Sequence, residues 1–281
     1  MTTRRQFMVS VPAAAAAFAL ADHFVLDMSP ARAQQIDPLQ GHFHPKGKAP
    51  SKFTLDVLKR AKATLPFADK RDFEEHTKGL IAPMKDLKIM ADAGHVAWDM
   101  ERFQFLDGQD DIDSIHPSLL RQSRFTTNYG LYEVIPGSIY QVRGFDLSDI
   151  SFVRGKTGWI VFDPLVTKEV VQAAWKLFQE HVGEGLPVSA VIYSHTHGDH
   201  WGGVRGIVDE ADVRSGKVPL FAPIDFMDFT VSENVYAGNA MNRRLFYQYG
   251  LLLPASPYGY VGQGLGQAVS CLLYTSDAAD E

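Results

Sequence analysis

The sequence predicts a mixed α/β protein in which helices pack outside a mixed β-sheet. Four short strand-like segments, paired by turns, come first in the central part of the chain. An amphipathic helical segment over 167–182 follows them, and then a continuous apolar run of strand length over 188–193. Hairpins followed by a helix and a buried strand are typical of sheets that combine antiparallel and parallel pairs.

Size and composition are those of a globular protein. The chain has 281 residues, of which 46% are hydrophobic and 21% charged, enough for one large or two small domains. The net charge of −6, without a basic run, disfavours binding to nucleic acid. A single cysteine, Cys271, excludes an internal disulfide.

The first 33 residues have the three parts of an export signal. Arg4 and Arg5 make a basic start, an alanine-rich apolar stretch follows over 9–21, and Ala31-Arg32-Ala33 is a small-x-small cleavage site. The arginine pair before Gln6 and Phe7 resembles the twin-arginine motif; a general secretory signal or a buried alanine helix are the alternatives. We therefore expect a periplasmic or secreted protein with no stable membrane span, because a span needs ~20 apolar residues.

Residues 34–128 predict an N-terminal arm followed by helices. A solvated arm is the favoured interpretation of the His42-Phe43-His44 pair, with a metal-binding pair as the alternative. The expected elements are a polar arm over 34–50, a short amphipathic helix over 52–62, two further helical pieces over 69–82 and 83–93, and a loop over 105–123 that leads into a short helix.

Residues 129–270 contain the predicted sheet. The expected hairpin strands cover 131–135, 139–142, 150–153 and 159–162. The second turn, over 154–158, carries glycines where we expect positive φ. Thr167 can begin the helix and Gly183 and Gly185 can end it. The run over 188–193 predicts a buried strand.

The segment that carries the chemistry follows this last strand and reads His195-Thr196-His197-Gly198-Asp199-His200. Imidazole nitrogens and a carboxylate oxygen are ligands that Zn²⁺ prefers. Side chains two apart on an extended segment point the same way, and a turn at Gly198 lets Asp199 and His200 project toward a second point. The segment can therefore supply ligands to two metal ions. A surface cluster is the less favoured alternative, because three of the ten histidines lie in these six residues.

Asp163 ends the strand that precedes the helix. From there its carboxylate can accept hydrogen bonds from the histidine segment and orient it, as carboxylates behind metal ligands do. A turn or N-cap aspartate is the equally plain alternative. Motifs for a serine nucleophile elbow, a phosphate-binding loop or a dinucleotide fingerprint are absent from the sequence.

The pattern His195-x-His197-x-Asp199-His200 after a strand resembles the metallo-β-lactamase superfamily, whose fold is an αββα sandwich with the site at the sheet edges. The resemblance implies that residues 129–270 are the first half of such a sandwich. Flanking blocks look like type III, zinc-dependent alkylsulfatases, which cleave detergents such as dodecyl sulfate. These blocks are 116–123, 139–146, 158–161, 200–213 and 231–244.

The resemblance implies roles for individual residues. His195 and His197 would bind one zinc ion, and Asp199 and His200 the other and take part in catalysis. A water between two zinc ions becomes acidic enough to attack near neutral pH, giving an alcohol and inorganic sulfate. Arg243 and Arg244 could bind the sulfate, with a structural ion pair as the alternative. The complete parent enzyme would be a homodimer.

The sequence also departs from this family. The family completes its zinc sites with acidic residues and a histidine well downstream, whereas His200 is the last histidine here. Residues 271–281 resemble translated sequencing-adapter DNA, so we expect a non-native tail; a natural divergent tail is the alternative. We therefore expect a truncated exported alkylsulfatase with weak zinc binding and little turnover. The alternatives are another hydrolase of this fold, acting on a lactam, thioester or phosphoester, or a non-catalytic fragment.

Overall fold

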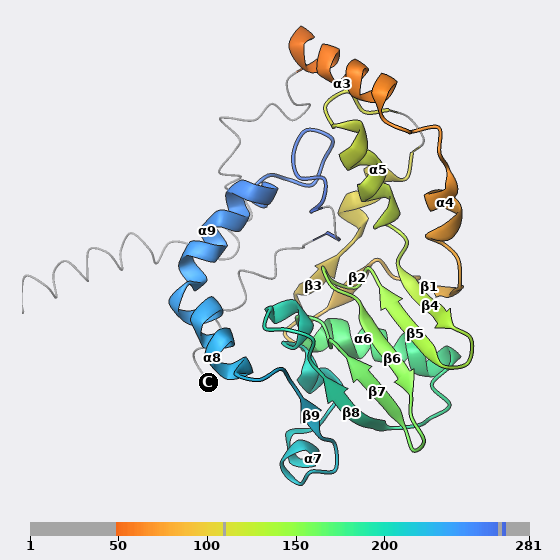
Figure 1. The fold of residues 1–281 in the computed structure, drawn as a ribbon, viewed down its shortest axis with the longest axis vertical. Helices are drawn as coiled ribbons and strands as arrows, with labels where there is room; N and C mark the ends of the chain where they lie inside the picture. Colours follow the sequence, from red (N-terminus) through yellow and green to blue (C-terminus); the bar gives the residue numbers. More distant parts are fainter. Residues whose placement is uncertain (1–48, 109–110, 264–265, 268–281) are drawn as a thin grey trace, which may run out of the picture. The chain divides into compact units, whose positions relative to one another are not determined.

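The described part of the chain is built on a seven-stranded sheet. A computed structural model describes residues 49–108, 111–263 and 266–267, so the predicted signal, the arm histidines and the tail over 271–281 lie outside the described residues. The sheet has the order β1-β4-β5-β6-β7-β8-β9 (Figure 1). Its strands are β1 (Leu80–Pro83), β4 (Gly130–Ile135), β5 (Ile139–Arg143), β6 (Ile150–Arg154), β7 (Trp159–Phe162), β8 (Val188–Ile192) and β9 (Leu220–Phe221).

The sheet changes from antiparallel to parallel at β7. Strands β1 and β4 to β7 pair antiparallel, whereas β7 with β8 and β8 with β9 pair parallel. Helix α6 (Lys168–His181) connects β7 to β8, because parallel neighbours need a crossover connection. Phe162 lies opposite Ile192, so β7 and β8 end at the same edge of the sheet. The predicted mixed α/β fold is confirmed.

Helix α6 closes the hydrophobic core against one face of the sheet (Figure 1). The Phe178 ring stacks on Phe152, with centroids 4.1 Å apart, and Trp159 meets it edge-on at 4.8 Å. All three side chains are fully buried. The Thr167 hydroxyl accepts a hydrogen bond from the Val170 amide, so Thr167 begins the helix as the sequence predicts.

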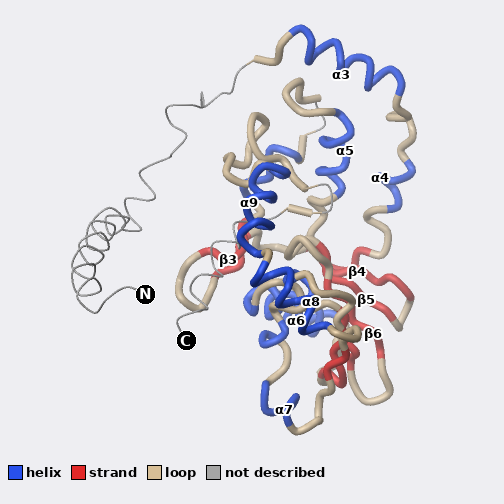
Figure 2. Tube along the Cα trace, turned by 60° about the vertical axis from the view of Figure 1, so that its left-hand side comes forward, coloured by secondary structure: helices blue, strands red, loops and turns tan. Residues whose placement is uncertain are grey.

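Shorter elements surround the sheet. Helices α3 and α5 lie beyond one end of the strands and α7 beyond the other in both views (Figures 1 and 2). No helix among the described residues is long and apolar enough to cross a membrane. The elements are α3 (Lys52–Thr64), α4 (Arg71–Glu75), β2 (Lys88–Met90), β3 (Val96–Asp99), η1 (Glu101–Leu106), α5 (Pro117–Phe125), η2 (Gly198–His200), η3 (Val204–Gly206), α7 (Glu210–Arg214), α8 (Phe226–Val231), the π-helical η4 (Ser232–Tyr236) and α9 (Gly238–Tyr249).

The helical piece predicted over 83–93 is wrong, and the one predicted over 69–82 is confirmed only for the short α4. Strands β1 and β2 follow α4. Leu80 pairs with Tyr132 of β4, and the pairing places β1 at the sheet edge. Sheet pairing outweighs a weak local helical preference, and a proline such as Pro83 is tolerated in an edge strand.

The β6–β7 hairpin forms as predicted, but the expected positive φ at its glycines is wrong. Gly155 and Gly158 are not among the residues with positive φ, whereas Gly137 in the preceding hairpin has φ 67°. Gly158 is needed for space instead, because a Cβ there would overlap the Pro187 carbonyl oxygen.

Strand β8 is less buried than the sequence predicts. Ala190 and Val191 are buried, but Val188 and Ile192 are only partly covered. The cause is topological, because β8 lies next to the two-residue edge strand β9.

Phe178→Ala should lower the free energy of unfolding by about 3–5 kcal/mol, because it leaves a cavity between α6 and the sheet. Chemical denaturation measures the change. The control is Phe53→Ala in α3, whose ring is 82% exposed, and it should change stability by less than about 0.5 kcal/mol. Equal effects of the two substitutions would contradict this assignment of the core.

Candidate metal centre

The predicted metal segment lies at the sheet edge where β7 and β8 both end. Asp163 follows β7, and its backbone amide donates to the Ile192 carbonyl at 3.1 Å. Ser194 follows β8, and its amide donates to Asp163 Oδ1 at 2.8 Å. The parallel pairing therefore brings residues that are 31 positions apart into direct contact. We call residues 194–200 the histidine loop.

The three imidazoles of the histidine loop lie together. The His195 ring centroid is 4.0 Å from that of His200 and 4.6 Å from that of His197. The turn predicted at Gly198 is the one-turn helix η2, which carries Asp199 and His200 back toward His195. The four residues predicted as ligands are thus close to one another, and their role as ligands stays a prediction.

Contacts with oxygen atoms indicate which nitrogen of two of the rings faces an acceptor. The Ser194 hydroxyl donates its one proton to Asp163 Oδ2 at 2.6 Å, so it can only accept from His195 Nδ1 at 2.8 Å, which leaves the lone pair of His195 on Nε2. Glu233 Oε1 lies 3.0 Å from His197 Nε2, so a carboxylate faces this nitrogen and not Nδ1.

His200 differs from the other two because both of its nitrogens face carboxylates. Nδ1 lies 2.9 Å from Asp163 Oδ2 and Nε2 lies 3.3 Å from Asp199 Oδ2. Burial alone would lower the pKa of His200, but the bonds to Asp163 and Asp199 raise it to about 9. Burial and the charge of His200 lower the pKa of His195. The cluster without metal thus concentrates its positive charge on His200.

The two carboxyl groups beside His200 are stabilised as anions. Burial alone would raise the pKa of Asp163, but hydrogen bonds from His200 and Ser194 lower it. The pKa of Asp199 is lowered by His200 against the same opposing effect of burial. Asp163 thus contacts the histidine loop through both carboxylate oxygens. It is not the N-cap of the helix that follows, because Thr167 occupies that position.

The side chains of the histidine loop are of the types that bind zinc. Too few of them are arranged around one point to complete a metal site. Neutral nitrogens of His195 and His197 and the Asp199 carboxylate are zinc ligands by chemistry. Within the described ranges, no group of three or more His, Cys, Asp or Glu side chains is arranged to hold a metal ion. His200 would also have to exchange the proton that faces Asp199 for a metal ion.

The β5–β6 loop supports the histidine loop from behind. The Ser148 hydroxyl donates to the Asp199 carbonyl oxygen. The buried Asp146 carboxyl accepts from the Leu147 amide at 2.5 Å and from the Val166 amide at 2.6 Å, which ties this loop to the segment after β7. Burial raises the pKa of Asp146 to about 8, although these two amides oppose the shift.

Gly203 lets the chain after the histidine loop pack closely. Its amide donates to the Leu165 carbonyl at 2.9 Å, and a Cβ would lie 2.5 Å from the carbonyl oxygens of Pro164 and Thr167. A side chain at this position would therefore prevent the close packing.

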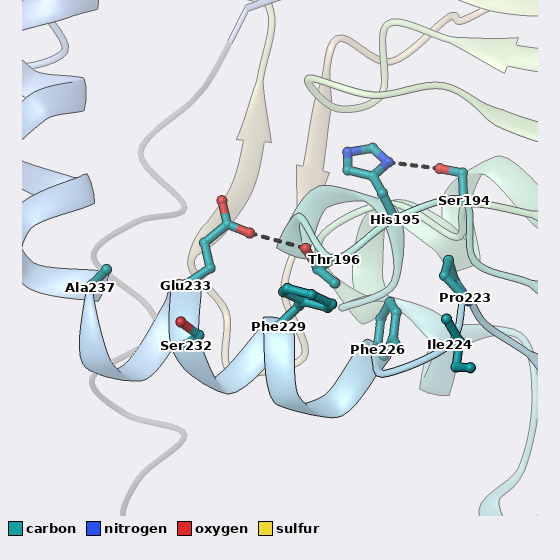
Figure 3. Close-up of a pocket in the computed structure, with 10 residues that line it drawn as sticks. All are labelled: Ser194, His195, Thr196, Pro223, Ile224, Phe226, Phe229, Ser232, Glu233 and Ala237. Carbon is teal, nitrogen blue, oxygen red and sulfur yellow. Dashed lines mark hydrogen bonds between the residues drawn. The ribbon is translucent and has the colours of Figure 1, made fainter.

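A cavity of about 430 Å³ opens beside His195 (Figure 3). Helix α8 and the residues before it form its apolar wall, and the histidine loop forms the polar side. The lining residues are Ser194, His195, Thr196, Pro223, Ile224, Phe226, Phe229, Ser232, Glu233 and Ala237.

Arg243 and Arg244 are not brought to this cavity. Both are exposed on α9, and neither lines the cavity nor forms an ion pair with another residue that the structure describes. Sulfate binding by these arginines stays a prediction.

Sequence reasoning missed Glu233, Asp146 and Ser148. Glu233 and Ser148 contact residues of the histidine loop that are more than 35 positions away in the sequence. Asp146 acts by accepting from the Val166 amide of the backbone. No sequence spacing therefore marks any of the three. All three lie within or next to the sequence blocks that resemble alkylsulfatases, and this resemblance was the only feature of the sequence that could have indicated them.

Comparison with known proteins places this geometry in a family. Residues 143–268 match the model of the metallo-β-lactamase superfamily. That range includes the β5–β6 loop, Asp163 and the whole histidine loop.

The segment that carries the site, residues 143–268, is thus similar to the metallo-β-lactamase superfamily. Among curated relatives, the chain is 44% identical over 219 residues to an alkyl/aryl-sulfatase of Saccharomyces cerevisiae, covering 78% of this chain and 33% of that protein. It is 48% identical over 207 residues to a linear primary-alkylsulfatase of Pseudomonas sp., covering 73% and 30%. The chain thus spans about a third of the length of the relatives it matches.

A solved structure agrees with the fold. The stereoselective inverting sec-alkylsulfatase of Pseudomonas sp. superimposes with a TM-score of 0.74 at 43% identity, over 79% of this chain and 34% of that one. The fold of this chain is therefore similar to that of the alkylsulfatase over the matched region.

Asp146→Asn should reduce the pH dependence of stability. The folded state raises the pKa of Asp146 from 3.8 to about 8, so the folded protein keeps a proton that the unfolded chain releases. This stabilisation is complete below about pH 4 and is lost as the pH rises toward 8. Denaturant unfolding at pH 5 and pH 8 should therefore show a larger fall for the native protein than for the variant.

Asp113→Asn is the matched control, because its side chain is 66% exposed. It should leave the native pH dependence unchanged. A fall of equal size in the native protein and in Asp146→Asn would contradict the prediction.

Proposed function

We propose that this chain carries the histidine-loop part of a zinc-dependent alkylsulfatase, which hydrolyses alkyl sulfate esters such as dodecyl sulfate to an alcohol and sulfate. The observation that carries the proposal is the arrangement of His195 and His197. Nδ1 of His195 contacts the Ser194 hydroxyl at 2.8 Å and Nε2 of His197 lies 3.0 Å from Glu233 Oε1, so each ring faces an oxygen with one nitrogen and can offer the other to a metal ion. Identity of 43–48% to alkylsulfatases supports the choice of substrate class.

The residues of this chain would have two roles, metal binding and orientation of the metal ligands. His195 and His197 would bind one zinc ion, and Asp199 and His200 a second. A zinc ion at such a site supplies an acidified water and a positive charge for the sulfate oxygens. Asp163 would orient His200 directly and His195 through the Ser194 hydroxyl. Ligands in addition to these four are needed to complete two tetrahedral sites.

The cavity beside His195 supports an amphiphilic substrate. Its wall of Phe226, Phe229 and Ile224 is apolar, while Ser194 and Thr196 line the side next to the histidines. A substrate with an apolar chain and a charged head matches such a surface better than a wholly polar one does. We also propose that the protein is exported to the periplasm or secreted, and that the full-length parent protein is a homodimer.

Zinc should bind this chain weakly but specifically. We expect Zn²⁺ to raise the midpoint temperature of unfolding of the native protein, because binding to the folded state alone stabilises it. His195→Ala should abolish the rise. His181→Ala is the control, because His181 lies exposed in the last turn of α6, away from the loop. A rise of equal size in His195→Ala would contradict the assignment.

Sulfate release from dodecyl sulfate tests the activity. With zinc present we expect slow release, far below the roughly 10 s⁻¹ typical of enzymes, and none in His195→Ala. Nitrocefin and lactoylglutathione, which report lactam and thioester hydrolysis, should not be turned over.

Three results would each contradict a part of the proposal. Release equal to that of His195→Ala would remove the assigned activity, and turnover of nitrocefin would favour a lactam-hydrolysing relative. Release near 10 s⁻¹ would refute the need for further ligands.

A further inference from the structure

We propose that Glu233 is a positioning residue for the histidine loop, where it contacts residues other than those that Asp163 contacts. Glu233 itself lies outside the ligand set of the proposed function, whereas His197, which it contacts, belongs to that set. It depends on that function only where zinc affinity is concerned.

The Glu233 carboxylate contacts two successive residues of the loop. Its Oε1 lies 3.0 Å from His197 Nε2. Its Oε2 accepts from the Thr196 hydroxyl at 3.1 Å, the bond drawn in Figure 3. One side chain thus determines the orientation of the His197 ring and of the residue between the two histidines. The Glu233 side chain is 25% exposed, against 57% for His197, so the carboxylate lies on the inner side of the pair.

Thr196 is bound on two sides. While Glu233 accepts from its hydroxyl, Trp201 Nε1 donates to its carbonyl oxygen at 2.9 Å. Because His195 and His197 flank Thr196, a rotation of this residue would move both imidazoles. Glu233 and Trp201 together therefore restrict the loop at the position that both rings share.

The backbone that carries Glu233 is a π-helical turn. Residues Ser232–Tyr236 form η4 between α8 and α9, and the Ala237 amide donates to the Ser232 carbonyl, five residues back, at 3.0 Å. An inserted π-turn changes the direction of the side chains that follow it, and such turns are frequent at functional sites. Here the turn places a glutamate against the histidine loop.

The consequence for His197 is a preferred tautomer. The negative charge of a carboxylate 3.0 Å from Nε2 favours the proton on that nitrogen, which leaves the Nδ1 lone pair for another partner. Asp163 does the same for His195 through Ser194, leaving Nε2. Two carboxylates, one from the end of β7 and one from η4, therefore orient the rings from different sides of the loop.

The direct test is the tautomer of His197 in the full chain without metal. Long-range ¹H–¹⁵N NMR at about pH 8, where an unperturbed imidazole is neutral, distinguishes a proton on Nε2 from one on Nδ1. We expect the Nε2–H form in the native protein and a mixture in Glu233→Ala. Glu74→Ala, at an exposed glutamate in α4, should leave the native spectrum unchanged.

Zinc affinity provides a second measurement. Glu233→Ala should weaken zinc binding by about 10–100-fold, the loss typical when a carboxylate partner of a metal ligand is removed. Thr196→Val removes only the hydroxyl bond, so it should weaken binding less, and its effect should be smaller in a Glu233→Ala background. Glu233→Gln keeps the side-chain volume and serves if the alanine variant does not fold.

The outcomes separate this inference from the proposed function. An unchanged His197 tautomer in both Glu233→Ala and Glu233→Gln overturns the inference, whether or not zinc binds. A changed tautomer in a protein that binds no zinc supports the positioning role while the proposed function fails. Zinc affinity within twofold of native in both Glu233 variants would also overturn it.

Discussion

The site depends on the hydrogen bonds that the Asp163 carboxylate makes across the ends of two parallel strands. The carboxylate accepts from the Ser194 amide and hydroxyl and from His200 Nδ1, so it joins the end of β7 to the histidine loop after β8. The residue has φ 53°, a left-handed conformation that aspartate tolerates better than most side chains do. That conformation turns the chain out of β7 where the carboxylate meets its partners.

This arrangement is electrostatically possible only because each charge has a partner. Three imidazoles so close together cannot all be charged, and the positive charge is concentrated on His200 between Asp163 and Asp199. His195 Nδ1 faces the Ser194 hydroxyl, and His197 Nε2 lies 3.0 Å from Glu233 Oε1. A cation between the rings would replace the proton on His200, so the same carboxylates that stabilise the metal-free cluster would support the metal-bound one.

The hydrophobic core determines where the segments that carry Asp163 and the histidine loop lie. Helix α6 begins after the segment that contains Asp163 and packs on the sheet through Phe178, which determines where that segment lies. Gly203 then allows the chain beyond the histidine loop to pack against the same segment. Asp146 ties the β5–β6 loop to the Val166 amide, so three loops meet behind the site.

Local patterns were sufficient for the central elements and for the ligand candidates. Alternation and turn residues predict β4 to β7, helical spacing and a Thr167 cap predict α6, and the density of histidines predicts the loop, because each of these signals lies within a few consecutive residues. Strand β1 was missed because its structure comes from pairing with the distant strand β4, which a local helical preference does not report. Strand β2 was missed although it pairs with its neighbour β3.

The sequence by itself thus determined which strands and helix form the centre of the sheet and which residue types can bind a metal. Only the tertiary structure decided which groups contact them. The parallel pairing of β7 with β8 brings Asp163 to His200, and the π-turn of η4 brings Glu233 to His197. These contacts join residues 36 or 37 positions apart, a separation at which sequence spacing carries no geometric information until the chain has folded.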